Sequence, residues 1–353
     1  MNIAVIGLGY WGPNLVRNFL GNPNVTSVTI CDKNTERLEA AARKFPGIKT
    51  ETDVDKIYAD PTITAVAIAT PVYTHYNLAR KALESGKHVI MEKPFTRTVQ
   101  EAEDLITIAE HFGLTLMVDH TFLFTGAVQK MKEIIDEGKI GDVMYFDSVR
   151  ANLGLFQPDV NVIWDLAPHD ISILNYLVQA RPIAVSATGM KHYYGMENIA
   201  YMTVFYDEHI IAHFHVNWLS PVKIRTICVG GSDKMIYYDD MQTSEKVRVY
   251  DKGVNLNSKE GEYDLRVQYR AGDMWAPQTS NKEALAEVAA HFIHCIKTGE
   301  KPICDGYAGR DVTAILEAAE RSIKNSGQKV ALPSSVSGLP APERISSFII
   351  EKV

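Results

Sequence analysis

Residues 2–12 read Asn-Ile-Ala-Val-Ile-Gly-Leu-Gly-Tyr-Trp-Gly and are followed by a helical pattern. The apolar run at the start predicts a buried strand. Gly7, Gly9 and Gly12 then have the spacing G-x-G-x-x-G between this strand and the helix. In such a loop the first glycine permits a tight turn, the second lets a pyrophosphate approach the backbone, and the third allows close helix–strand packing. The stretch therefore predicts the first βα unit of a dinucleotide-binding domain.

The next predicted strand, residues 25–31, ends at Asp32. A carboxylate there would accept hydrogen bonds from the adenosine ribose hydroxyls and would repel a 2′-phosphate, so the sequence favours NAD over NADP. Lys33 opposes this preference because it could turn toward such a phosphate. We expect Asp32 and Lys33, together with Tyr10 and Trp11 of the glycine loop, to contact the cofactor.

Apolar runs continue to alternate with helical patterns through the first third of the chain. Strands are predicted at residues 65–69, 88–91 and 114–118, and the intervening helices are about 10–15 residues long. This alternation is typical of βαβ units and of a parallel sheet. We therefore expect a doubly wound Rossmann domain over residues 1–120.

The pattern changes to strand after strand in the second part of the chain, which is typical of an antiparallel sheet. The sequence predicts an α+β domain over residues 121–330, with a large, mostly antiparallel open sheet, and a C-terminal tail over residues 331–353. The strands are expected at 143–151, 182–189, 199–207, 210–219, 223–229, 234–239, 244–250 and 263–269. The helices are expected at 126–136, 162–178, 281–297 and 308–325, with a capping box Ser280-x-x-Glu283 opening the third.

Composition limits the classes of partner. The chain has 353 residues, 46% of them hydrophobic, which is typical of a globular protein of about two domains. Lys and Arg number 36 and Asp and Glu 43, so the net charge of −7 argues against a nucleic-acid partner. No apolar run reaches the roughly 20 residues of a membrane span. Four cysteines without C-x-x-C spacing and the lack of a signal-peptide pattern predict a cytoplasmic protein.

The strand at 88–91 runs into Glu92-Lys93-Pro94. The carboxyl end of a parallel strand faces the ligand crevice, so Lys93 could approach a substrate hydroxyl and a nicotinamide together. Thr70-Pro71 ends the preceding strand and faces the same crevice, and His75 lies one turn beyond. For Lys93 taken alone, a solvated lysine at a strand end is the alternative.

Together these segments resemble the glucose–fructose oxidoreductase, inositol dehydrogenase and rhizopine-catabolism (Gfo/Idh/MocA) family. The resemblance covers nearly the whole chain, including Glu137-Gly138-x-Ile140-Gly141. It implies NAD(P)-dependent oxidation or reduction of a sugar or polyol carbon. It further implies cofactor contacts from the glycine loop, from Thr70, Pro71 and His75, and from Glu92 and Lys93. The expected assembly is a homodimer or homotetramer formed through the second domain.

The family's other catalytic pair is an Asp-x-x-x-His on a second-domain helix, and this chain has Asp165 and His169 at that spacing. On a regular helix the two side chains share one face. The resemblance implies that His169 takes the hydroxyl proton while Asp165 holds its tautomer and Lys93 polarises the C–O bond. Pro168 suits only a first turn or a kink. The alternative assigns the role of base to Lys93.

Lys223 and Arg225 are predicted on one side of a strand, where they could clamp a phosphate or form a solvated face. Arg150 precedes the long loop 152–161 and is a further substrate-binding candidate, with Lys93, Asp165 and His169 completing that set. The segments 164–170 and 218–225 resemble the branch near UDP-N-acetylglucosamine and UDP-N-acetylglucosaminuronate 3-dehydrogenases. That resemblance implies a nucleotide-linked sugar acted on at its 3-position.

Three other readings are open at this point: an inositol, polyol or free-sugar dehydrogenase, a nonenzymatic NAD-sensing regulator, and a glycosidase that uses NAD transiently. Retention of Lys93, Asp165 and His169 argues against the regulator, since a sensor needs no proton-transfer groups. His213-x-His215 places two imidazoles on one strand face. No further ligand accompanies them at metal-binding spacing, so we expect no metal.

Overall fold

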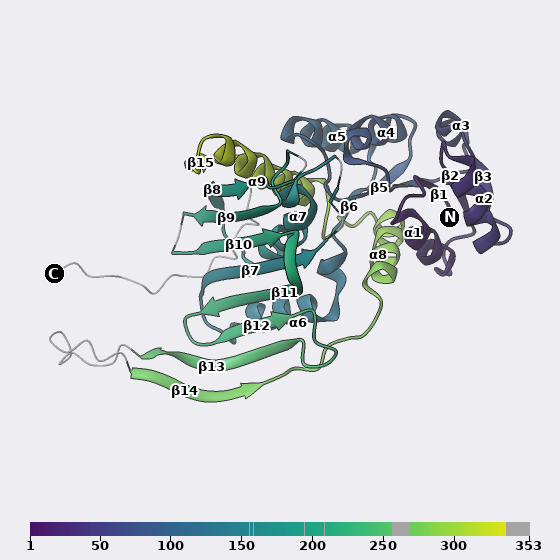
Figure 1. Ribbon diagram of the computed structural model, residues 1–353. Coiled ribbons are helices and arrows are strands. Elements are labelled where there is room, and N and C mark those ends of the chain that lie inside the picture. Colours follow the sequence, from purple (N-terminus) through teal and green to yellow (C-terminus); the bar gives the residue numbers. More distant parts are fainter. Residues whose placement is uncertain (155, 158, 194, 208, 256–267, 337–353) are drawn as a thin grey trace.

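The computed structural model describes residues 1–154, 156–157, 159–193, 195–207, 209–255 and 268–336. The first domain is a six-stranded parallel sheet in the order β3-β2-β1-β4-β5-β6 (Figure 1). Its strands are β1 (Asn2–Ile6), β2 (Ser27–Cys31), β3 (Lys49–Glu51), β4 (Ala65–Ile68), β5 (His88–Glu92) and β6 (Leu116–Asp119). Its helices are α1 (Gly12–Leu20), α2 (Thr35–Lys44), α3 (Val54–Ala59), α4 (Val72–Glu84) and α5 (Val99–Phe112). The predicted doubly wound domain is confirmed.

The chain order reverses between β1 and β4, which are neighbours in this sheet. A crevice forms at such a switch point, outside the carboxyl ends of the strands, and in open α/β sheets this is where ligands bind. All four residues of β4 are buried, as expected of a strand covered by helices on both faces. The short β3 and α3 were not predicted from the sequence.

The second domain is built on a nine-stranded sheet in the order β14-β13-β12-β11-β7-β10-β9-β8-β15. Within the described strands of this second sheet only the β7–β10 pair is parallel, so the predicted mostly antiparallel sheet is confirmed. The strands are β7 (Val143–Leu153), β8 (Pro182–Met190), β9 (Ile199–Tyr206), β10 (Ile211–Asn217), β11 (Leu219–Gly231), β12 (Met235–Asp239), β13 (Val247–Asn255), β14 (Gln268–Trp275) and β15 (Val330–Ala331). Burial alternates along β9 and β10, so one face of the sheet is covered and the other is partly open.

Five further helices complete the described part of the chain: η1 (Thr121–Phe124), α6 (Gly126–Asp136), α7 (Val162–Leu177), α8 (Ala284–Thr298) and α9 (Gly306–Lys324). Helix α7 packs against β7, β9 and β10, while α8 packs against α1 and α9 against α5 and α7 (Figure 1). The helices near the C-terminus therefore hold the two sheets together.

Several boundaries differ from the sequence expectation, and part of the expectation lies outside the described residues. The Ser280-x-x-Glu283 capping box is wrong, because α8 begins at Ala284 and the Glu283 carboxylate instead accepts a hydrogen bond from Arg17 of α1 at 2.9 Å. The tail expected from residue 331 begins inside the short strand β15, and residues 337–353 lie outside the described part. Residues 263–267 of the expected strand 263–269 also lie outside it. None of the helices in the described ranges has the length and hydropathy of a membrane span.

Candidate active site

The glycine loop has the geometry that a dinucleotide needs. Gly7 has a φ of +94°, and a Cβ on it would lie 2.6 Å from the Ala69 carbonyl oxygen. A Cβ on Gly12 would lie 2.1 Å from the Gly7 carbonyl oxygen, so helix and strand pack in close contact there. A Cβ on Gly9 would meet nothing within 4 Å, which leaves the loop open to a pyrophosphate. The tight turn at Gly7 and the close packing at Gly12 agree with the prediction, and the approach of a pyrophosphate at Gly9 stays a prediction.

Helix α1 begins directly after this loop, and Trp11 caps it without a side-chain hydrogen bond among the described residues. Pro13 has no N–H and the Asn14 N–H donates to the Trp11 carbonyl oxygen at 2.9 Å, so Gly12 is the residue of this first turn whose N–H could meet an anion. Tyr10 is 83% exposed and Trp11 44%, and their rings meet edge to face at 5.6 Å. Tyr10 and Trp11, which were predicted to contact the cofactor, are therefore both at the surface of the protein.

Asp32 follows β2, and its carboxylate is held in place by the glycine loop. Oδ2 accepts a hydrogen bond from the Leu8 N–H at 2.7 Å, and Oδ1 accepts one from the Asn34 N–H at 2.8 Å. Arg37, which sequence reasoning missed, lies 3.9 Å from Oδ2, whereas Lys33 is exposed. The site therefore presents one fixed carboxylate, with a guanidinium beside it.

His75 is buried behind the residues that line the crevice, so it supports them and does not itself face the cofactor as expected. It is 1% exposed, and its ring nitrogens lie 2.8 Å from the Thr70 carbonyl oxygen and 2.9 Å from that of Pro94. Burial lowers its pKa. The ring thus connects the end of β4 to the segment that carries Lys93. Thr70 shares a hydrogen bond with Thr74 at 2.7 Å, and Pro71 caps α4.

Lys93 joins the two domains. Its ammonium donates to the backbone oxygen of Asp165 at 2.7 Å and lies 3.3 Å from the carboxylate Oδ1 of that residue. The other carboxylate oxygen accepts a hydrogen bond from the indole of Trp218 at 3.1 Å. Trp218 is 1% exposed, so this donor is fixed. Asp165 therefore positions Lys93 at the carboxyl end of β5.

His169 does not donate the expected hydrogen bond to Asp165, because the two carboxylate oxygens of Asp165 accept from Lys93 and Trp218 instead. The Nδ1 of His169 is buried and has no hydrogen-bond partner in the described part of the chain. Its ring packs edge to face on Phe122 at 5.0 Å. Burial, and then the charge of Lys93, hold the pKa of His169 well below its usual range. The imidazole is thus neutral near pH 7, the form that accepts a proton.

Two arginine side chains lie against the ring of Phe122 in η1, the same ring that packs on His169. The guanidinium of Arg150 lies 4.5 Å from the centre of the Phe122 ring and that of Arg225 lies 5.9 Å from it. The two arginines are neighbours in the register of β7 and β11. Arg225 is paired with Asp240 at 3.3 Å and keeps a third of its side chain exposed. Of the two arginines, it is the one that is partly open to solvent.

Arg150 is placed differently from the sequence expectation. It is 3% exposed, and its Nε donates to Asp170 Oδ2 at 3.0 Å, an oxygen that also accepts from Ser148 at 2.7 Å. A buried, paired guanidinium anchors α7 to β7 instead of binding substrate. Lys223 is exposed on β11. Lys223 and Arg225 lie on the same strand as predicted, but Lys223 is exposed and Arg225 is half-buried.

Two buried carboxyl groups lie behind Lys93, at the ends of neighbouring strands. Glu92 and Asp119 are register partners, 8% and 2% exposed. Burial raises the pKa of Asp119 to about 6, although Thr121 donates a hydrogen bond to it at 2.7 Å. Burial, and then the charge of Asp119, raise the pKa of Glu92 well above its usual value. The pair therefore retains a proton near neutral pH. Of the two, only Glu92 was predicted.

Comparison with known proteins now adds to this geometry. Residues 1–120 match a family described as oxidoreductases with an NAD-binding Rossmann fold, and residues 128–237 match the GFO/IDH/MocA C-terminal domain. The chain belongs to the Gfo/Idh/MocA oxidoreductase family. The predicted resemblance is thereby confirmed over both domains.

Several members of the family are similar over almost their whole length. UDP-N-acetylglucosamine 3-dehydrogenase of Acidithiobacillus ferrooxidans is 27% identical over 89% of this chain and 94% of its own. The scyllo-inositol 2-dehydrogenase (NAD(+)) of Bacillus subtilis is 26% identical over 91% of this chain and 94% of its own. A structure of levoglucosan dehydrogenase with NADH and levoglucosan superposes with a TM-score of 0.80 over 94% of this chain and 99% of its own, at 21% identity. That last likeness concerns the fold alone.

Proposed function

We propose that the protein is an NAD-dependent dehydrogenase that transfers hydride between nicotinamide and a CH–OH carbon of a sugar. The observation that carries this proposal is the Lys93 ammonium, fixed by Asp165 across the two domains, beside neutral His169. When bound, the nicotinamide supplies the hydride acceptor. The Lys93 ammonium donates a hydrogen bond to the substrate oxygen and stabilises the negative charge that develops on it. His169 accepts the hydroxyl proton.

Lys93 is the competing candidate for the base, since it also lies within reach of a substrate oxygen in this arrangement. His169→Ala separates the two assignments. If His169 is the base, turnover falls by roughly 10²–10⁴-fold. Near wild-type turnover in that variant would assign the proton to Lys93 instead.

The proposed cofactor is NAD, with NADP disfavoured. A 2′-phosphate would lie against the Asp32 carboxylate, whose two oxygens are already fixed by backbone N–H groups. Arg37 opposes this preference for NAD, because its guanidinium lies near the same carboxylate and is 55% exposed. Titration of NADH and NADPH by fluorescence tests the preference; equal or tighter NADPH binding would contradict it.

The proposed substrate is a nucleotide-linked sugar or amino sugar, oxidised at its 3-hydroxyl or reduced from the 3-keto form. This is supported by the Acidithiobacillus relative and by Arg225, whose side chain is one third exposed near His169. The long segment between β7 and α7 contributes Phe156, whose ring packs 5.4 Å from Trp218, so this segment borders the site. Residues 155 and 158 of the predicted loop lie outside the described ranges.

The alternative substrate is an inositol or another polyol, favoured by the Bacillus relative and by the pairing of Arg150. Measurement of NADH formation with UDP-N-acetylglucosamine, scyllo-inositol and glucose distinguishes the two classes. A nucleotide sugar should have by far the lowest KM. Equal efficiency with free inositol or glucose would overturn the nucleotide-sugar proposal and leave the dehydrogenase proposal intact.

We further propose a homodimer or homotetramer formed through the open face of the second sheet. Tyr201 and Ile211 are 44% and 47% exposed on that face, and the Tyr201 ring stacks on His215 at 4.6 Å. Exposed apolar side chains on adjacent strands are typical of an interface. Light scattering after size-exclusion chromatography tests the assembly; a monomer at micromolar concentration would contradict it.

A further inference from the structure

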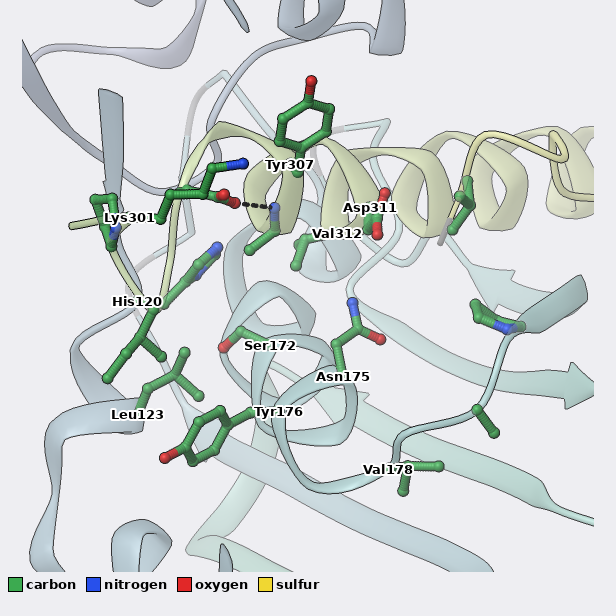
Figure 2. Close-up of a pocket in the computed structure, with 17 residues that line it drawn as sticks. His120, Leu123, Ser172, Asn175, Tyr176, Val178, Lys301, Tyr307, Asp311 and Val312 are labelled. Atoms are coloured by element: carbon green, nitrogen blue, oxygen red, sulfur yellow. Dashed lines mark hydrogen bonds between the residues drawn. The ribbon is translucent and has the colours of Figure 1, made fainter. Parts of the chain in front are cut away.

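A partly enclosed space lies beside the candidate active site, between η1, α7 and the first turns of α9 (Figure 2). It is a cavity of about 510 Å³, which is within the range of small-molecule sites. Leu123, Val178 and Val312 contribute apolar walls, and His120, Asn175 and Asp311 contribute polar groups. Among the described residues, neither Lys93 nor Asp165 nor His169 lines it.

His120 is the most informative residue of this wall. It is 1% exposed, and neither ring nitrogen has a hydrogen-bond partner in the described part of the chain. Figure 2 shows the imidazole pointing from the end of β6 toward the first turn of α9. Buried polar groups are nearly always hydrogen-bonded, so two unpaired nitrogens beside a cavity indicate a missing partner.

Burial disfavours charge on this wall of the cavity. Asp311 accepts a hydrogen bond from the Arg310 guanidinium at 2.9 Å, yet burial raises its pKa to about 7. Asp305 caps α9 by accepting from the Ala308 N–H at 2.9 Å, and burial raises its pKa as well, an effect that the nearby Lys301 charge only partly offsets. A ligand that carried a charge would meet the same cost of burial, which an uncharged molecule avoids.

We propose that this cavity is a second binding site, which takes an uncharged alicyclic or aromatic alcohol whose hydroxyl hydrogen-bonds to His120. The ring of the alcohol lies against the apolar wall. A neutral imidazole can accept from that hydroxyl or donate to it, so either orientation satisfies one nitrogen.

The cavity adjoins the candidate active site through η1. His120 lines the cavity, and Phe122, two residues further along the chain, packs edge to face on His169 at 5.0 Å. The proposed second site is therefore close to the groups that act on substrate but separate from them.

Calorimetric titration of the full chain with cyclohexanol, and with cyclohexanecarboxylate as the charged counterpart, tests the proposal. No cofactor or sugar is present, so the outcome is independent of the dehydrogenase proposal. We expect saturable binding of one cyclohexanol per chain and at least tenfold weaker binding of the carboxylate. Absence of cyclohexanol binding, or equal binding of the two compounds, would overturn the proposal.

Two variants locate the binding. His120→Phe keeps a ring of similar size and removes both nitrogens, so cyclohexanol affinity should fall about tenfold, as expected for the loss of one hydrogen bond. Ala180→Trp fills the half-buried rim of the cavity and should abolish binding while His120 stays in place. Leu20→Trp on the exposed face of α1 adds the same indole elsewhere and should change nothing. Unchanged affinity in both cavity variants would contradict the proposed site.

Discussion

Trp218→Phe tests whether the indole fixes the group that positions Lys93. The substitution keeps an aromatic ring in a 1% exposed position but removes the pyrrole part of the indole, including the N–H that binds Asp165 Oδ2 at 3.1 Å. A hydrogen bond to a charged group contributes about 1.5–3 kcal/mol. If about 2 kcal/mol of this is lost from the transition state, kcat falls roughly 30-fold. We expect that fall with the affinity for NADH unchanged, since the glycine loop is untouched.

Trp164→Phe is the matched control. Trp164 lies on the same helix as Asp165, and its indole donates to Glu320 of α9 at 3.2 Å. Loss of this hydrogen bond should lower the free energy of unfolding but leave kcat within about twofold. The measurements are steady-state kinetics and urea unfolding of both variants. If Trp218→Phe retained wild-type kcat, or if the two variants lost activity equally, the positioning role of Trp218 would be refuted.

Three further predictions concern the cofactor loop and the buried carboxyl pair. Asp32→Ala should raise the NADPH-to-NADH affinity ratio at least tenfold, measured by fluorescence titration; an unchanged ratio would argue against the ribose contact. Gly9→Ala should keep the wild-type Tm but weaken NADH binding, whereas Gly12→Ala should lose both, because its Cβ would overlap the Gly7 carbonyl oxygen; equal effects would contradict the loop geometry. The raised pKa of Asp119 means that the folded state holds extra protons, so its contribution to stability is present at low pH and is lost as the pH rises from about 4 through about 6. Asp119→Asn should flatten that decline in urea midpoints between pH 4 and 7.5, and an equally steep decline would exclude Asp119 as its source.

The parts that were predictable from the sequence depend on local chemistry. The strand–glycine–helix order fixes what Gly7, Gly9 and Gly12 must do, and the alternation of strands and helices leads to the parallel sheet. Asp32 follows from its place at the end of the next strand. Each of these inferences needs only neighbours in the sequence, and the structure agrees with the roles of Gly7 and Gly12, the parallel sheet and the place of Asp32 after β2.

The residues whose contacts were predicted wrongly bind groups that are distant in the sequence. Asp165 was expected to bind His169, four residues away, but Trp218 from the β10–β11 junction and Lys93 from the first domain take its oxygens. Arg150 was expected to meet substrate, but α7 brings Asp170 against it. A spacing of four residues shows that two groups share a helix face; it does not show which more distant donor competes for the carboxylate.

The packing of α8 gives a second example. Ser280 and Glu283 have the spacing of a capping box, yet Glu283 pairs with Arg17, which is 266 residues away in the chain. A charge-assisted contact between two helices outweighs a local capping bond there. His75 was likewise misjudged, because the sequence does not reveal that the carbonyls of Thr70 and Pro94 enclose its ring.

NADH formation by the wild type and by Lys93→Met, followed at 340 nm with UDP-N-acetylglucosamine, scyllo-inositol and glucose, tests the proposed activity most directly. We expect the wild type to reduce NAD with at least one of these substrates. Lys93→Met should be slower by at least about 10²-fold, in line with the loss of a positioned acid–base group, and should bind NADH with wild-type affinity. Wild-type turnover in Lys93→Met, or no NADH with any sugar or polyol despite tight NADH binding, would contradict a Lys93-dependent sugar dehydrogenase.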